Sequence, residues 1–369
     1  MYPAIYINFA FKDGPTGGGN QFLKALYGRF KKFGIAVDNP AEAQVVIINS
    51  HHSLAAALEL RRTYPALTFV HRIDGPMRLY NQPGDPRDNL VFLANRCLAD
   101  ATVFQSHWSR QRNHDLGLAF NDLETIIYNA PDPRIFNRIG KSVYGGARKP
   151  RVIASSWSDN WKKGFRCYWY LDTHAVPSEF EMTFVGKSPL KFQNIKMFEP
   201  LDSTALASVL KQHDIYLTAS ENDPCSNSLI EARHCGLPVI ASRSGGHPEL
   251  VEEGGEFFDS PEEIPGLVAD IADNYQHYAR GGGLPGIDAV AEAYADFCRR
   301  AAAHKAKTAE EGKESPYAAE MEKEMAEDRL RDLLGLERTK KQSIHNLLTR
   351  CRTLFLCETP LDESGLRDS

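Results

Sequence analysis

The residues best suited to chemistry lie in one segment, SENDPCSNSLIEARHCGLPVIASRSGGHPELVE, which runs from Ser220 to Glu252. It holds two acidic residues, Asp223 and Glu231, eight positions apart. Between them, at the expected start of a helix, lie three polar residues: Ser226, Asn227 and Ser228. The first backbone N–H groups of a helix have no intrahelical partner, so this helix start could bind a phosphate.

The two carboxylates could bind hydroxyl groups of a ligand on either side of that phosphate. Glu231 falls about one turn into the helix, where an acidic residue can accept hydrogen bonds from both hydroxyls of a ribose. Asp223 precedes the helix, where a sugar joined to the phosphate would lie. The spacing fits a structural role equally well, with Asp223 as a helix N-cap and Glu231 on the helix surface.

Lysines in two loops are further candidates for binding a phosphate. Lys162 and Lys163 follow a predicted strand over 151–155, and Lys187 follows a second predicted strand. A lysine between a strand and a helix can hold a diphosphate as a point charge. Loop lysines are also often simply solvated, so these residues alone do not predict a site.

A glycine-rich loop near the N-terminus has a similar geometry. The predicted strand over 4–9 leads through the run DGPTGGG, which contains Gly18 and Gly19, into a predicted helix. This order of elements directs backbone N–H groups at an anion, and the helix dipole favours negative charge there. The run is neither GxGxxG nor a P-loop, and a plain turn would also explain it.

Strands and helices must position these residues, and the two alternate along the chain. Short apolar runs such as 45–48 are separated by helical patterns such as 54–62. The alternation predicts doubly wound parallel sheets, in which ligands bind beyond the carboxyl ends of the strands. His71 and Asp74 follow the predicted strand over 67–70, so they are candidate site residues. A packing or capping role is the alternative for His71.

The length of 369 residues favours two domains. A proline-rich turn and the linker-like run GKSVYGGARKP predict a boundary between a first domain over 1–145 and a second over 146–300. The composition predicts that residues 301–369 form a charged helical extension with a disordered end. Within it, a basic amphipathic helix over 340–356 is expected to pack against protein, or to lie on an anionic membrane.

Composition argues against several classes of function. Charged residues make up 25% of the chain and the formal net charge is −5, which argues against nucleic acid as a partner. The seven cysteines lack CxxC spacing, and Cys225, His234 and Cys235 lack a second pair of zinc ligands, so we expect reduced thiols and no metal. The N-terminus lacks the features of a signal peptide, and no apolar run is long enough to span a membrane, which predicts a cytoplasmic protein.

Together these motifs resemble those of the family 4 retaining glycosyltransferases, over roughly residues 1 to 300. The acidic-x7-Glu pair of Asp223 and Glu231 carries most of the resemblance, because it is followed by the family's small-Gly-x-Pro-Val stretch at 235–239. The remaining motifs are Gly18-Gly19, Tyr128-Asn129-x-x-Asp132, Lys163-Gly164, Val185-Gly186 and Gly245-Gly246-x-Pro248-Glu249.

The resemblance implies an α/β protein of GT-B architecture, with two Rossmann-like domains facing a cleft and a helical extension after them. It implies that a sugar moves from a nucleoside-diphosphate-sugar to a hydroxyl of a glycan or small-molecule acceptor, with retention and without a metal or other cofactor. It assigns catalytic roles to Asp223, Lys163 and His71. It assigns donor binding to Glu231, Ser226, Asn227, Ser228, Gly18, Gly19, Lys162 and Lys187.

Two features depart from the family's pattern. Asp223 replaces the usual Glu, which is one methylene longer, and no basic residue occurs between 155 and 160, a lack that Lys162 or Lys187 could offset. Two other functions therefore stay open. One is a GT-B nucleotide-sugar epimerase, which would isomerise the donor without an acceptor. The other is a non-catalytic nucleotide-sugar-binding scaffold that uses its tail for partners.

Overall fold

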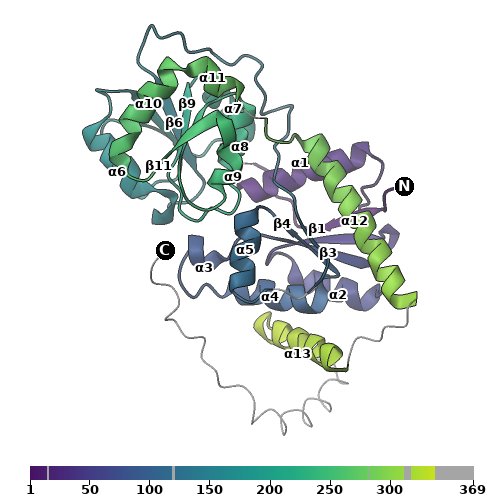
Figure 1. Ribbon diagram of the computed structural model, residues 1–369. Helices are drawn as coiled ribbons and strands as arrows, with labels where there is room; N and C mark the ends of the chain where they lie inside the picture. Colours follow the sequence, from purple (N-terminus) through teal and green to yellow (C-terminus); the bar gives the residue numbers. More distant parts are fainter. Residues whose placement is uncertain (15, 119–120, 282, 311–316, 337–369) are drawn as a thin grey trace.

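Two parallel β-sheets, each covered by helices on both faces, form the two domains of the protein (Figure 1). The computed structural model describes residues 1–14, 16–118, 121–281, 283–310 and 317–336. The amphipathic helix predicted over 340–356 and the predicted disordered end lie outside these residues. Within them, no helix is both long enough and apolar enough to cross a membrane.

The first sheet is parallel throughout. Its strands follow the order β1 (Ile5–Asn8), β2 (Val45–Asn49), β3 (Thr68–Ile73), β4 (Ala101–Phe104) and β5 (Glu124–Ile126). Ala36 adds a parallel bridge to Ile5 on the other edge of β1. The chain therefore leaves β1 in one direction for Ala36 and then returns past β1 to β2, which is the reversal of a doubly wound sheet.

Helices cover both faces of this first sheet. α1 (Gly18–Lys32) lies on one face, and α2 (Leu54–Thr63) and α4 (Arg87–Leu98) lie on the other. α1 buries Phe22, Leu23, Leu26 and Phe30, an apolar stripe at helical spacing. The shorter elements of this domain are η1 (Pro40–Glu42), α3 (Met77–Tyr80) and α5 (His107–Asp115).

The second sheet has six parallel strands. Their order is β8 (Lys196–Phe198), β7 (Glu181–Gly186), β6 (Arg151–Ser156), β9 (Ile215–Thr218), β10 (Val239–Ser242) and β11 (Gly255–Phe258). The order reverses between β6 and β9, so a crevice opens at the carboxyl ends of these two strands. The edge strands β8 (KMF) and β11 (GEFF) were not predicted from the sequence, because they are short and lack the apolar runs of the central strands.

Helices also cover both faces of the second sheet. One face carries α6 (Phe165–His174), α10 (Ile264–Asp273) and α11 (Tyr275–Arg280), and the other carries α7 (Ser203–Lys211), α8 (Asn227–His234) and α9 (His247–Val251). Three short 3-10 helices complete the domain: η2 (Trp161–Lys163), η3 (Glu252–Gly254) and η4 (Pro261–Glu263). Two facing doubly wound domains confirm the predicted GT-B architecture.

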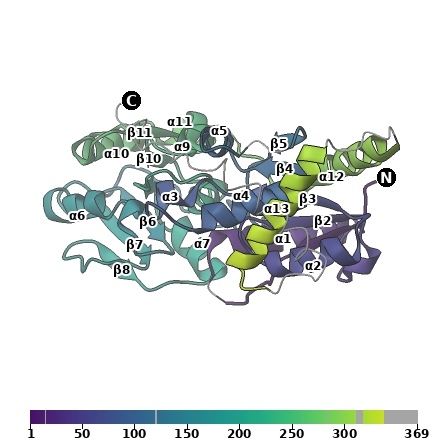
Figure 2. The ribbon, with the colours of Figure 1, turned by 90° about the horizontal axis from the view of Figure 1, so that it is seen from below.

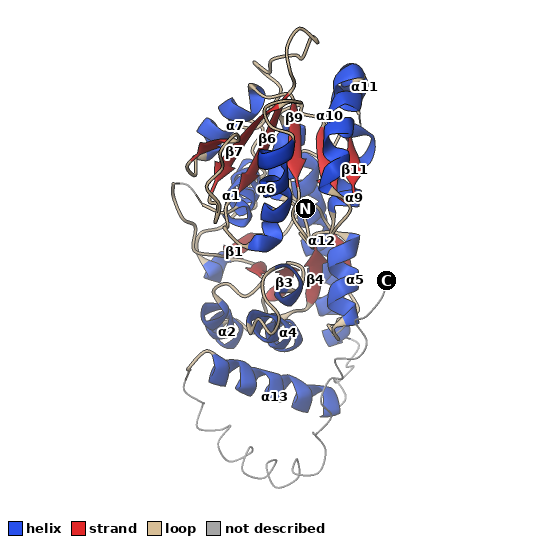
Figure 3. Ribbon diagram, turned by 90° about the vertical axis from the view of Figure 1, so that its left-hand side faces the viewer, coloured by secondary structure: helices blue, strands red, loops and turns tan. Residues whose placement is uncertain are grey.

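The last two helices pack on the first domain (Figure 1, Figure 2). The second domain therefore ends before residue 287, where the first of these helices begins, and not at residue 300 as predicted. α12 (Ile287–Glu310) shares a core with α1, into which it buries Tyr294 and Phe297. α13 (Tyr317–Leu333) packs against α4 and buries Leu330 as an outer layer of the same domain (Figure 3). The apolar stripe of a helix predicts burial, but it does not identify which sheet buries it.

Candidate functional site

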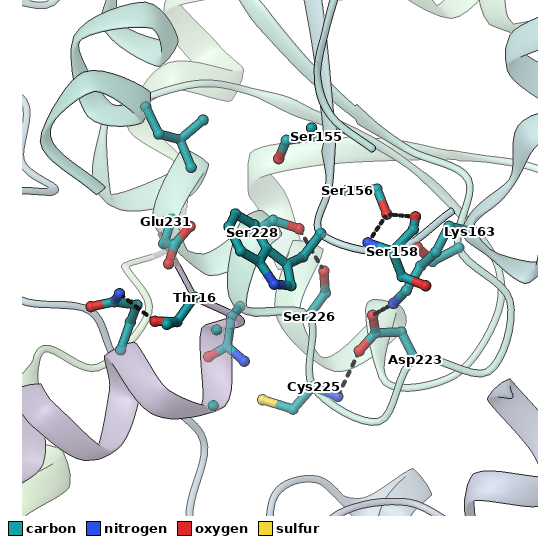
Figure 4. A pocket seen from close by; sticks show the side chains of 18 of the residues that line it. Thr16, Ser155, Ser156, Ser158, Lys163, Asp223, Cys225, Ser226, Ser228 and Glu231 are labelled. Atoms are coloured by element: carbon teal, nitrogen blue, oxygen red, sulfur yellow. Dashed lines mark hydrogen bonds and ion pairs between the residues drawn. The ribbon is translucent and has the colours of Figure 1, made fainter. Parts of the chain in front are cut away.

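A cavity of about 290 Å³ lies between the two domains, at the carboxyl ends of both sheets (Figure 4). The second domain contributes the end of β6, the loop after β9 and the start of α8. The first domain contributes the glycine-rich loop and the residues that end or follow β3 and β4, including Asp74 and Gln105. A polar cavity at this position is where a doubly wound fold binds its ligands.

Two helix N-termini meet at the cavity. α1 begins at Gly18 and α8 begins at Asn227, and both residues line the cavity together with Gly19 and Ser228. A Cβ on Gly18 would lie 2.5 Å from the Cβ of Asn227, so glycine is needed for the two helices to approach this closely. The unpaired N–H groups and positive dipole ends of both helices favour an anion here.

Lys163 and Asp223 form an ion pair beside these helix starts. Lys163 Nζ lies 3.0 Å from Asp223 Oδ2, and both residues line the cavity. Burial raises the pKa of Asp223, but the charges of Lys163 and His247 and the hydrogen bonds to the carboxylate outweigh it, so this pKa lies below its ordinary value. Asp223 is therefore ionised at neutral pH.

The backbone of the Asp223 loop is held by the turn after β10. Gly246 N–H donates to the Asp223 carbonyl at 2.8 Å. Gly245 has a φ of +65°, and a Cβ there would lie 2.4 Å from the same carbonyl oxygen. Glycine at this position therefore allows both the left-handed backbone and the close approach. The sequence pair Gly245-Gly246 thus supports the loop that presents Asp223.

Glu231 lies at the cavity wall, on the buried side of α8. It is 8% exposed, and burial raises its pKa to about 8. At neutral pH this carboxyl is therefore mostly protonated. A protonated carboxyl can donate one hydrogen bond and accept others, so it can bind two neighbouring hydroxyl groups.

Three residues predicted from the sequence lie outside the cavity. His71 is fully buried inside the first domain, where its ring nitrogens lie 3.0 Å from the Ser50 carbonyl and 3.3 Å from Asn95 Nδ2. The Lys162 ammonium donates to the Leu79 carbonyl at 2.5 Å. Lys187 follows Gly186 at the rim, and its side chain does not line the cavity. The structure thus corrects the predicted catalytic role of His71, which faces the α2 and α4 side of the sheet.

Arg72, the neighbour of His71, lines the cavity but was not among the residues predicted from the sequence. Successive side chains of a strand point to opposite faces, so Arg72 faces α1 while His71 faces α4. The guanidinium donates to Asn49 Oδ1 at 2.6 Å and to Asn129 Oδ1 at 2.7 Å. The alternation of side chains along a strand could have predicted this position, because one of two adjacent polar residues in the strand must face α1.

Glu249 joins the two domains on one side of the cavity. Its carboxylate accepts hydrogen bonds from the backbone N–H groups of His107 and Trp108, at 2.7 and 2.8 Å, and so caps α5 of the first domain. The carboxylate also accepts a hydrogen bond from the Tyr128 hydroxyl at 2.9 Å. Burial, and then this contact with Glu249, raises the pKa of Tyr128. Nearby, the Ser106 hydroxyl donates to the Pro224 carbonyl at 2.6 Å. The first domain therefore contacts the loop that carries Asp223.

The chain is similar to known glycosyltransferases over part of its length. Residues 172–277 match the family model described as Glycosyl transferases group 1. A probable sucrose-phosphate synthase of Thermosipho melanesiensis is 35% identical over 71 residues, which are 19% of this chain and 17% of that protein. The N-acetyl-alpha-D-glucosaminyl L-malate synthase of Bacillus anthracis is 25% identical over 173 residues, 42% of this chain and 45% of that protein. The chain thus spans less than half the length of these curated relatives.

Solved structures share the fold at low sequence identity. Anabaena HepE, solved in complex with UDP and glucose, superimposes with a TM-score of 0.57 at 15% identity, over 84% of this chain and 100% of that chain. The sucrose-phosphate synthase of Thermosynechococcus elongatus gives a TM-score of 0.52 at 15% identity, over 80% of this chain and 78% of that chain. At this identity the likeness shows the two-domain fold.

Proposed function

We propose that the protein is a retaining glycosyltransferase that moves a sugar from a nucleoside-diphosphate-sugar to an acceptor hydroxyl. One observation carries the proposal. A single cavity between the two domains gathers two helix N-termini, the Lys163–Asp223 pair and the buried Glu231. These groups match the parts of such a donor, which are a diphosphate, a sugar and a ribose.

In this proposal the groups around the cavity stabilise the leaving group. When the bond to the anomeric carbon breaks, negative charge gathers on the distal phosphate of the nucleoside diphosphate. The Lys163 ammonium and the N–H groups at the starts of α1 and α8 would stabilise this charge as it develops. Because a cation and two helix N-termini face this position, we propose transfer without a metal.

The two carboxyl groups would hold the two ends of the donor. Glu231 would bind the ribose hydroxyls, and Asp223, next to Lys163, would bind hydroxyls of the donor sugar. The acceptor would bind on the side of the first domain, where Asp74 and Tyr80 line the cavity. Its hydroxyl would attack from the face that the diphosphate leaves, which retains the configuration of the anomeric carbon.

The proposal is tested by turnover of nucleotide-sugars. The protein is incubated with uridine-, adenosine- and guanosine-diphosphate sugars, with and without candidate glycan acceptors, and nucleoside diphosphate release is measured. We expect release from at least one donor, a product with the donor's anomeric configuration by NMR, and loss of release in Glu231→Ala but not in the exposed control Glu253→Ala. If no donor is turned over, or if the donor sugar is isomerised without an acceptor, the proposal is wrong.

A further inference from the structure

Two cationic side chains line the cavity within the part of the chain that the structure describes, and they come from different domains. Lys163 belongs to the second domain and Arg72 to the first. The charge of Lys163 already faces Asp223 at 3.0 Å. A diphosphate carries at least two negative charges, so the second domain alone offers it little net positive charge.

Arg72 is a buried cation whose closest partners are neutral. Its side chain is 1% exposed, and the side-chain oxygens of Asn49 and Asn129 accept its two shortest hydrogen bonds. Its Nε is buried without a hydrogen-bond partner among the described residues. Amide oxygens orient a guanidinium but do not neutralise it, and a buried charge without a full counter-charge is unfavourable.

Asp74 is the carboxylate closest to this guanidinium, and the contact is long. Arg72 Nη1 lies 3.4 Å from Asp74 Oδ1, whereas a strong charge-assisted hydrogen bond spans about 2.7–2.9 Å. The same oxygen accepts a hydrogen bond from Gln105, and 27% of the Asp74 side chain is exposed. Asp74 therefore satisfies Arg72 only in part.

A hydrogen-bonded chain connects Arg72 to the start of α8. Asn129 accepts from Arg72 and donates through Nδ2 to Asn227 Oδ1 at 3.1 Å, in the other domain. Asn129 Nδ2 also donates to Gln105 Oε1 at 2.8 Å. The guanidinium is thereby held beside the two helix starts that face the cavity.

We propose that Arg72 binds a phosphate-class anion in the cleft and supplies the second cation that the second domain lacks. This inference rests on the proposed function. The anion is either the distal phosphate of the donor or a phosphate on the acceptor, which the first domain would hold. Because Arg72 and Lys163 belong to different domains, both cations reach the anion only when the cleft is closed.

Calorimetric titration of four proteins tests the assignment: the wild type, Arg72→Gln, Arg72→Lys and Asp74→Asn. The probes are uridine, adenosine and guanosine 5′-diphosphates, the matching monophosphates, and inorganic phosphate. Arg62→Gln, on an exposed arginine of the first domain, is the control. For a donor phosphate, we expect Arg72→Gln to weaken diphosphate binding about tenfold or more, to affect the monophosphate little, and Arg72→Lys to recover part of the loss.

An acceptor phosphate gives a different result. Arg72→Gln then leaves nucleoside diphosphate binding unchanged but abolishes inorganic phosphate binding to the nucleotide-loaded protein. Asp74→Asn is expected to tighten anion binding in either case, because it removes a competing negative charge. The inference is overturned if folded Arg72→Gln binds every probe as the wild type does. If Arg72→Gln does not fold, unchanged or weaker binding by Asp74→Asn overturns it.

Failure of the proposed function looks different in the same experiment. A wild type that binds none of the nucleoside diphosphates contradicts the proposed function. In that case, the titration with inorganic phosphate still tests whether Arg72 binds an anion. Binding that depends on Arg72 supports the anion site, and absence of binding overturns it.

Discussion

Lys163 and Asp223 pair across the crevice of the second sheet, with 3.0 Å between Nζ and Oδ2. Lys163 follows β6 and Asp223 follows β9, the two strands between which the strand order reverses. The pair therefore lies where the fold itself opens a ligand site. The Asp223 side chain, although one methylene shorter than that of Glu, is long enough to reach the lysine.

Loss of the lysine is expected to slow the reaction more than it weakens binding. Lys163→Ala removes a cation that we propose stabilises the departing phosphate, so we expect kcat to fall about a hundredfold. The matched control is Lys191→Ala, on an exposed lysine of the same domain. Steady-state kinetics on the preferred donor provides the measurement. A kcat for Lys163→Ala close to that of the control would remove Lys163 from the mechanism.

The contact between Gly18 and Asn227 is expected to control closure of the cleft. Gly18→Ala would place a Cβ 2.5 Å from that of Asn227, so the domains must separate or α1 must shift. We expect a larger radius of gyration by small-angle scattering and a large loss of activity. Gly28→Ala is the control in the same helix, because a Cβ at Gly28 meets nothing within 4 Å. Equal scattering and activity of the two variants would contradict the close approach.

The buried Glu231 predicts a pH dependence of stability. Its folded-state pKa of about 8 lies above the unfolded value of 4.5, so the native state retains a proton that the unfolded state loses as pH rises. Glu231 therefore lowers the free energy of unfolding progressively between about pH 4.5 and 8, at roughly 1.4 kcal/mol per pKa unit, or a few kcal/mol in total.

Chemical denaturation of the wild type and Glu231→Gln measures this effect. The variant cannot ionise, so we expect its advantage in stability over the wild type to grow from pH 5 to pH 8. Above pH 8 the advantage should stay constant, because both states of the wild type are then ionised at this residue. A difference that does not change with pH would show that Glu231 ionises normally in the folded protein.

Glu249 is expected to act through the arrangement of the domains. Glu249→Gln keeps the size of the side chain but removes the charge that caps α5 and the second acceptor oxygen of the carboxylate. We expect kcat/KM to fall about tenfold while the melting temperature changes little, since the contact joins two folded domains. Glu253→Gln, on an exposed glutamate nearby, is the control. Wild-type kinetics in Glu249→Gln would show that the contact does not position the cleft.

The central strands and the loops after them could be predicted because their signals are local. The first four residues of β2, VVII, are apolar and the whole strand is buried, as expected of a strand covered on both faces, and β9 is followed by the polar loop that carries Asp223. Lys163, Asp223, Glu231 and the glycine-rich loop were therefore candidates from their positions after strands, and the resemblance to glycosyltransferase motifs supplied their predicted roles. The reversal of strand order in the second sheet brings Lys163 and Asp223 together, and the contact between the two domains brings the glycine-rich loop to the same cavity.

The remaining features depend on contacts between distant parts of the chain. His71 has the residue type of a catalytic group, but the pleat of β3 turns it toward Asn95 and brings Arg72 to the cavity instead. The apolar stripe of α12 fits either sheet, and only its packing beside α1 decides the domain to which it belongs. Glu249 belongs to one of the sequence motifs, but only the fold shows that its carboxylate accepts hydrogen bonds from the N-terminus of α5 in the other domain.

Binding of a nucleoside diphosphate and its 2′,3′-dideoxy analogue tests the central claim most directly, because the claim places a ribose against Glu231 in the cleft. Calorimetry is performed with the preferred base on the wild type and on Glu231→Ala. We predict that the wild type binds the dideoxy form about tenfold or more weakly, and that this difference disappears in Glu231→Ala. Equal affinity of the wild type for both forms, or a difference that persists in Glu231→Ala, would contradict the account.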